Sequence, residues 1–317
     1  MQQADNHISS QRRPPVFDFP NEIQFVIFHR AARSHSSCAY TLTLVSRHVH
    51  EWIQPILYEH VVIRNPRAAM CFYRTIKSRP KGYIESFVKT LAFDSSVKLA
   101  DAKPILARCS SNITTFLSFR KTDSPHSLVE LLDERATLQR LTLVYQHSPM
   151  LISTPMEQRY EIPSKIVTSL THLIAVFDLS SHWSDITREL LRASDTRSTK
   201  PSVPAAFAKF QNLTHVAFPS NAWWNFSPIQ EVATKLQVLA VLEPANCSPI
   251  KHSQLLNTIR ATGDRRLIIV EKLGTASLWR VDSEDCWGPY DFWERIQGLV
   301  DLGYISDSGE RWDDYCQ

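Results

Sequence analysis

Six short segments of the 317-residue chain share one spacing of apolar residues, with an apolar residue at the first and fourth positions and another near the sixth. Their fourth positions are Leu91, Phe116, Leu141, Leu173, Val216 and Leu239. The segments follow one another at intervals of 25, 25, 32, 43 and 23 residues, and weaker copies flank them at Val61/Ile63 and Leu267/Ile269. A short strand that recurs at such a period buries its apolar side only by stacking on its neighbours. The pattern therefore predicts a repeated strand, stacked copy on copy.

Helix signals lie between the predicted strands. Ser127 precedes a helical run as its cap, and Ser227 does the same with a proline at the first helical position. A third run begins after Ser248 and stops at Gly263. Because strand and helix alternate, the sheet should be parallel. We therefore expect an α/β fold, in which residues 58–278 form an irregular leucine-rich-repeat-like solenoid with a parallel sheet.

The repeat departs from a regular one in two ways. Regular leucine-rich repeats carry Asn or Cys at position nine, where the side chain bonds the backbone of neighbouring turns. Here Asn221 alone matches, and the other five positions hold Ser96, Lys121, Gln146, Asp178 and Pro244. Ser118 and Ala175, at sixth positions, are poor core residues, which predicts a one-residue shift of their strands. The alternative interpretation is a generic α/β domain with coincidental leucine spacing.

Composition argues against most catalytic classes. The chain has only 7 glycines, and neither of the glycine-rich phosphate-binding motifs is present. The 6 cysteines are never closer than 30 residues, so they do not form the close pairs of a structural zinc site. Motifs of hydrolases, metalloproteases and kinases are absent. We therefore expect a protein that is not an enzyme and that carries no cofactor and no metal.

Charge is divided unevenly along the chain. Residues 282–317 hold ten acids and two bases, a net charge of −8, which leaves +11 on the remainder. The bases of the remainder are scattered and form no patch, so we expect no nucleic-acid partner. The chain has no apolar run of membrane-spanning length and no apolar leader, so we expect no membrane partner. The predicted location is cytoplasmic and/or nuclear, and not secreted.

The N-terminal part is predicted to differ from the repeats. Residues 1–16 are polar and end in a proline pair, which predicts a disordered tail. Residues 17–57 predict a small helical domain with helices from Pro20 to Arg33, from Tyr40 to Ser46, and from Arg47 to Ile53. The last helix is expected to end before a proline, because the residue preceding proline disfavours the helical conformation.

The residues of this domain resemble an F-box. That family opens with Leu-Pro-x-Glu followed by apolar residues, and this chain has Phe19-Pro20-Asn21-Glu22-Ile23 and then Phe25-Val26-Ile27-Phe28. The family's later Leu-x-x-Val-Ser-Arg stretch and tryptophan correspond to residues 42–47 and Trp52. Phe19 stands where the family has leucine, and the linker at residues 34–38 is longer than expected. The whole chain is similar to F-box proteins with degenerate leucine-rich repeats that are common in mushroom-forming fungi.

The resemblance implies a function and a set of contact residues. It implies docking on the adaptor protein of a cullin-RING (SCF-type) ubiquitin ligase, while the solenoid binds an unknown protein target as the substrate-recognition subunit. The adaptor-binding residues that it implies are Phe19, Pro20, Glu22, Ile23, Ile27, Val45 and Trp52. The alternative for Phe19, Ile23, Ile27 and Trp52 is burial against the first strand. Alternative functions are a leucine-rich-repeat-like binding scaffold with no ligase role and, more remotely, a cryptic hydrolase.

Aromatic residues are concentrated in the acidic C-terminal segment, residues 279–317. Tryptophan and tyrosine dominate interface hot spots, which makes Trp287 and Trp293 candidate target-binding residues. The same aromatic residues are suited to covering the open edge of the last strand. We favour a cap that folds back on the final repeat.

Overall fold

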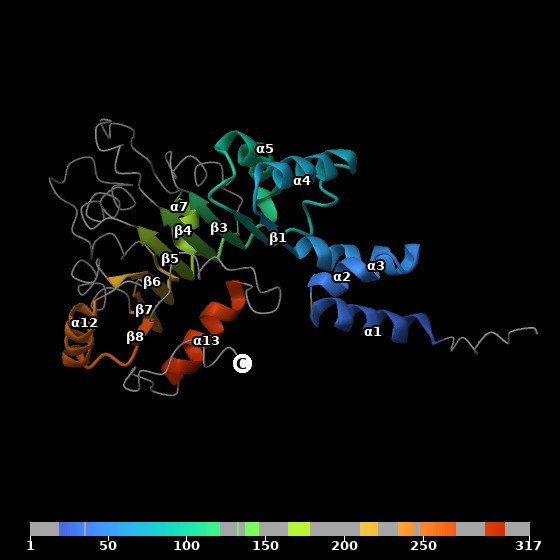
Figure 1. The fold of residues 1–317 in the computed structure, drawn as a ribbon. Coiled ribbons are helices and arrows are strands. Elements are labelled where there is room, and N and C mark those ends of the chain that lie inside the picture. The colour runs from blue at the N-terminus through green and yellow to red at the C-terminus, as the bar shows by residue number, and fades with distance from the viewer. Residues whose placement is uncertain are drawn as a thin grey trace, which may run out of the picture. The chain divides into compact units, whose positions relative to one another are not determined.

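The computed structural model describes residues 19–34, 36–120, 132, 137–145, 164–177, 210–220, 234–243, 248–270 and 289–301. The chain forms two compact units, residues 1–57 and residues 58–317 (Figure 1). The tail predicted at residues 1–16 lies outside the described residues, as do the helices predicted after Ser127 and Ser227.

The N-terminal unit contains the three predicted helices, with changed bounds. They are α1 (Asn21–Ser34), α2 (Ser36–Leu42) and α3 (Arg47–Glu59). The second helix begins four residues earlier than expected, so α1 and α2 are separated by a single residue and the linker is short. Ser46 caps α3, because its Oγ accepts a bond of 3.2 Å from Val49 N.

The prediction that α3 ends before Pro55 is wrong. The helix continues through this proline to Glu59. Val49 and Ile53 before the proline are buried, and Ile56 and Leu57 after it pack against the same cluster. The apolar face therefore continues across Pro55, and its burial outweighs the backbone bond that the proline removes.

In the part of the chain that the structure describes, the larger unit is built on one eight-stranded sheet. Its strands are β1 (His60–Ile63), β2 (Thr90–Phe93), β3 (Thr115–Arg120), β4 (Arg140–Tyr145), β5 (His172–Phe177), β6 (His215–Pro219), β7 (Val238–Leu242) and β8 (Leu267–Val270). Each strand pairs with the next one in the chain, and all seven pairings are parallel. The predicted α/β fold with a parallel sheet is confirmed.

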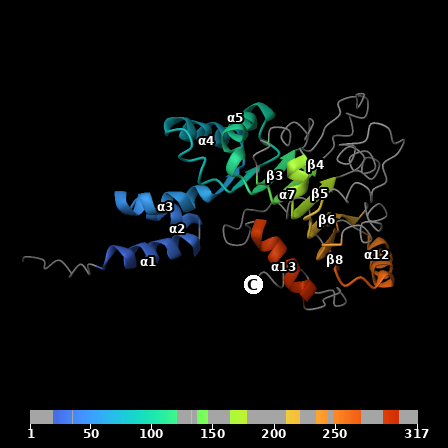
Figure 2. The same ribbon diagram turned by 180° about the vertical axis from the view of Figure 1, so that it is seen from behind.

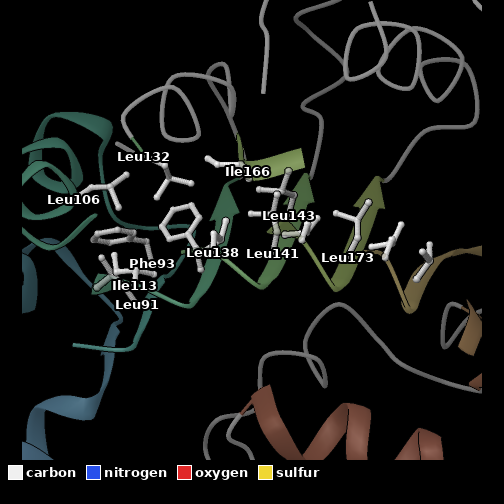
Figure 3. Close-up of a cluster of buried hydrophobic side chains, with 14 of the residues drawn as sticks. Leu91, Phe93, Leu106, Ile113, Leu132, Leu138, Leu141, Leu143, Ile166 and Leu173 are labelled. Carbon is white, nitrogen blue, oxygen red and sulfur yellow. The ribbon is translucent and has the colours of Figure 1, made fainter. Parts of the chain in front are cut away.

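All eight strands share one register. The fourth template positions pair across the whole sheet, in the order Val61, Leu91, Phe116, Leu141, Leu173, Val216, Leu239 and Leu267. All eight side chains are buried, at 9% exposure or less, and Figure 3 shows part of this row. The predicted equivalence of these positions is therefore confirmed.

The predicted shift of the strands that carry Ser118 and Ala175 is wrong. Phe93 pairs with Ser118, Ser118 with Leu143, and Leu143 with Ala175, without a slip. The backbone just before each strand explains this register. Five carbonyls there each accept hydrogen bonds of 2.7–3.1 Å from two N–H groups of the following copy, and they are the carbonyls of Lys89, Thr114, Gln139, Thr171 and Thr214. This ladder holds the register regardless of the size of a side chain further along the strand.

Helices cover one face of the sheet. Among the described residues they are α4 (Pro66–Ser78), α5 (Leu99–Cys109) with the short η1 (Ser110–Asn112), α7 (Ser164–Ser169) and α12 (Pro249–Thr262). Their apolar side chains join the buried strand row in one core, and α13 (Pro289–Asp301) lies on the opposite side (Figures 1 and 2). Helix α12 follows Ser248 and ends before Gly263, whose φ of 63° suits a left-handed helix stop, as predicted.

A serine bonds a neighbouring turn at position nine of the second copy. The Oγ of Ser96 donates to the carbonyl of Arg64, 32 residues earlier, over 2.6 Å. Ser96 thus makes the kind of bond for which regular repeats use asparagine. The position-nine residues of the five later copies, Asn221 among them, are outside the described residues.

We predict that shortening a side chain of the central row destabilises the sheet. Leu141→Ala leaves a cavity at a 1% exposed site and should lower the free energy of unfolding by about 3 kcal/mol. Val62→Ala, on a strand residue that is 43% exposed, should cost less than about 1 kcal/mol. Urea denaturation of both variants measures the difference in the free energy of unfolding. Equal losses of this free energy would contradict the burial of Leu141 in the central row.

Candidate functional site

Helix α1 presents an exposed apolar stripe. Phe19 just before the helix, and Ile23, Val26 and Ile27 within it, are 51%, 47%, 60% and 50% exposed. Spacings of three and four residues place them along one side of the helix. We call these four residues the α1 stripe.

The same helix uses its other side for the small core of its unit. Ala32 is buried there and Phe28 packs against the same cluster. Only Ala32, Ala39, Val49 and Ile53 are fully buried in that cluster among the described residues. A helix with apolar residues on both sides, in a unit with so small a core, leaves apolar surface available for a partner.

The structure places the other predicted adaptor-binding residues in three positions. Pro20 and Glu22 are exposed at the start of α1, where the Pro20 carbonyl accepts bonds from Ile23 N and Gln24 N at 3.0 Å each. Val45 is 58% exposed in the turn after α2. Trp52 is half-buried on α3, with its ring edge-on to Phe25 at 5.5 Å between centroids.

Sequence reasoning missed exposed apolar residues of the same unit. They are Phe25, Val26, Tyr40 and Leu44, at 39–71% exposure. The helical spacing of Val26 from Phe19 and Ile23 could have shown that it belongs to the stripe.

The sheet offers a second surface, on the face opposite α4, α5, α7 and α12. We call it the second face. The first residue of each strand from β1 to β7 lies on this face, and these residues pair in register from strand to strand. They are His60, Thr90, Thr115, Arg140, His172, His215 and Val238. Six of these seven are polar, whereas the adjoining row on the helix-covered face is entirely apolar. The sequence holds a signal of this row in the repeated Leu-Thr-His of residues 170–172 and 213–215, which the apolar template did not consider.

His172 and His215 form a stacked pair within this row. Their rings lie 4.2 Å apart between centroids at an interplanar angle of 14°. Trp293 of α13 contacts both rings edge-on, at 5.4 Å from His172 and 5.2 Å from His215. One side chain of the C-terminal helix thereby covers two neighbouring strands.

Hydrogen bonds determine the protonation of His215. The amide Nε2 of Gln297 donates to Asp301 Oδ1 over 2.7 Å, which turns its Oε1 toward the ring of His215. His215 Nε2 therefore carries the proton and donates to that Oε1 over 3.0 Å. In the neutral ring Nδ1 is then without a proton, and it lies 2.8 Å from Thr214 Oγ1, a hydroxyl that also lies 3.1 Å from the Thr171 carbonyl.

The surroundings hold both imidazoles neutral. Burial, together with the neighbouring charges of His215 and Arg140, lowers the pKa of His172 to about 3. Burial also lowers the pKa of His215, against the opposing effect of its bond to Gln297. The stacking also disfavours a pair in which both rings are charged, since two charged rings at this distance would repel each other.

Helix α13 packs on the second face through an apolar side of its own. Phe292, Trp293 and Ile296 are at most 4% exposed, and Val300 adjoins them. They contact small and aliphatic strand residues of the second face, which are Ile174, Ala217, Val238, Ala240, Leu242, Ile268 and Val270.

This position refines the expectations for residues 279–317. The described part of the segment covers a face of β5–β8, whereas we expected it to cover the edge of the last strand. Trp293, a candidate target-binding residue, is 4% exposed, so here it packs within the fold and is not a surface contact. Trp287 lies outside the described residues.

The described residues contain no cluster of three or more His, Cys, Asp or Glu side chains able to hold a metal ion. None of the helices within the described ranges has the length and apolar character needed to cross a membrane. Burial raises the pKa of the Cys109 thiol to about 12, so this cysteine stays protonated and unreactive at neutral pH.

The chain matches no known protein-family model, and no curated protein matches it in sequence.

We predict that acid destabilises the larger unit through its histidine pair. The folded pKa of His172 lies well below the value of about 6.5 in an unfolded chain. The neutral ring therefore contributes its full stability above about pH 6.5, and this contribution is lost as the pH falls from there toward 3. Melting temperatures measured from pH 7 to pH 4 should fall more steeply for the wild type than for His172→Gln. Parallel curves would contradict this assignment.

Proposed function

We propose that the chain is a non-enzymatic substrate-recognition subunit of a cullin-RING ubiquitin ligase. Residues 17–57 are the F-box-like unit that docks on the ligase adaptor. Residues 58–278 are an irregular leucine-rich-repeat-like solenoid that binds a protein target. The observation that carries the proposal is the α1 stripe, because it is apolar, exposed and located where the F-box-like sequence begins.

The energetics of the stripe suit an anchor. Each of its four side chains is about half exposed, and burying the remainder stabilises a complex by about 1 kcal/mol per residue. A gain of about 4 kcal/mol does not by itself meet the cost of association. Leu44 and Val45, at 71% and 58% exposure, supply further apolar area in the same unit. The stripe is therefore the central contact of a larger surface.

The sheet supports the second half of the proposal. Strands that stack in sequence order and in one register extend a binding surface copy by copy, as solenoid proteins do. A binding scaffold with no ligase role would have the same sheet. The α1 stripe favours the ligase subunit over the scaffold, because the scaffold needs no exposed apolar helix in a separate unit.

The decisive experiment is binding to the purified adaptor. Wild-type chain should bind at micromolar concentration or tighter, measured by calorimetry. Replacing Pro20 and Ile23 by alanine should weaken binding tenfold or more, because it truncates a residue of the α1 stripe and the exposed proline at the start of the same helix. Ile250→Ala is a matched control, since Ile250 is 72% exposed on α12 in the larger unit. It should leave adaptor binding unchanged.

Two results would count against the proposal. Failure of the wild type to bind the adaptor would remove the ligase role and leave the scaffold. An equal loss of binding in the Ile250→Ala control would show that the α1 stripe is not the contact. Circular dichroism of each variant distinguishes the loss of an adaptor contact from the loss of folded structure.

A further inference from the structure

We propose that the second face over β5–β8 is a binding site for an amphipathic helix and that α13 is its exchangeable occupant. A target that presents such a helix replaces α13, so the chain's own helix limits target binding. This inference rests on the proposed function, in which the sheet binds the target, and specifies how that binding is regulated.

Helix α13 can leave the sheet without disrupting the pairing of the strands. The seven strand pairings are made between the strands themselves, and α13 adds no strand to them. Its contacts within the described residues are side-chain contacts: the apolar cluster, the ring contacts of Trp293 with the two histidines, and the bond from His215 to Gln297. Eighteen residues of chain separate Val270 at the end of β8 from Pro289 at the start of α13. Release of α13 therefore breaks no bond of the strand ladder.

The floor of the site is shaped for a helix. Ala217 and Ala240 pair in register on β6 and β7, and both are completely buried. Their small side chains let a helix approach closely, while Ile174, Leu242 and Ile268 surround them with larger apolar groups. Helix α13 presents Phe292, Trp293, Ile296 and Val300 to this surface, which is the spacing of one side of a helix.

The histidine end of the site gives it selectivity. Trp293 lies against the stacked rings, and Gln297, four residues later, accepts a hydrogen bond from His215 Nε2. An occupant without an acceptor at this place would leave a buried N–H unpaired, which is unfavourable. The site therefore prefers a helix that carries an aromatic residue followed by a glutamine, or another acceptor, one turn later.

The histidines also distinguish an exchangeable site from a permanent layer of core. Aliphatic side chains would pack under a fixed helix without the hydrogen-bond partners that a buried imidazole requires. His172 and His215 instead lie within bonding distance of the hydroxyls of Thr171 and Thr214, at 2.8 Å in each case. Such a surface is compatible with water when α13 leaves and with an apolar helix when α13 returns.

The test uses a labelled synthetic peptide of residues 287–303 and the full-length chain. In one chain variant, Trp293→Ala and Ile296→Ala weaken the resident helix. Fluorescence anisotropy should show that the peptide binds this variant at least tenfold more tightly than the wild-type chain, whose own helix competes at high effective concentration. A peptide carrying Gln297→Leu is the matched control and should bind the variant more weakly.

Two outcomes of the peptide test would overturn the proposal. Absence of peptide binding to the folded variant would show that the face does not accept a helix supplied separately. Equal binding to variant and wild type would place the peptide elsewhere.

Amide hydrogen exchange of the wild-type chain is a second test, and it needs no substitution. Amides of α13 should exchange at least tenfold faster than those of β6 and β7, because α13 opens without unfolding the sheet. Exchange of α13 only together with these strands would overturn the proposal even if the variant failed to fold. Neither test involves the ligase adaptor, so failure of adaptor binding and failure of helix exchange are separate results.

Discussion

The backbone hydrogen bonds just before the strands determine the register of the sheet, and the two faces of the larger unit depend on that register. Five carbonyls, those of Lys89, Thr114, Gln139, Thr171 and Thr214, each accept two N–H groups from the next copy, which fixes where the strands β2 to β7 begin relative to one another. Because side chains alternate along a strand, a fixed start assigns each residue to one of two faces. A slip of one residue would exchange the leucine row for the histidine row.

The two faces differ in what they can do. The helix-covered face is a continuous apolar core, in which Leu141 and its partners are buried in one row. The second face combines alanines, aliphatic residues and a histidine pair, and over β5–β8 it carries a helix that follows all the strands in sequence. The first face provides stability, whereas the second is composed like a surface that binds helices. The N-terminal unit adds a third surface, the α1 stripe, whose apolar residues its own small core does not use.

The sequence predicted the parallel sheet because the apolar template recurs along the chain and helix signals lie between its copies. It did not predict that Ser118 stays in register, since the ladder depends on backbone groups that carry no side-chain signal. The rule that a helix ends before a proline considers only neighbouring residues. Helix α3 continues through Pro55 because apolar residues before and after the proline pack in the same cluster. The histidine pair required comparison of polar residues between copies, and the place of α13 depended on tertiary packing.

The common register is tested most directly by a double-mutant cycle on Leu173 and Val216. These residues are partners on β5 and β6, and both are buried. The account predicts that the alanine substitutions couple by about 0.5 kcal/mol or more in urea unfolding. Leu91 and Leu239 lie on strands far apart in the sheet, so the free-energy losses of their alanine substitutions should be additive. Additive losses for Leu173 and Val216 would contradict the register on which both faces depend.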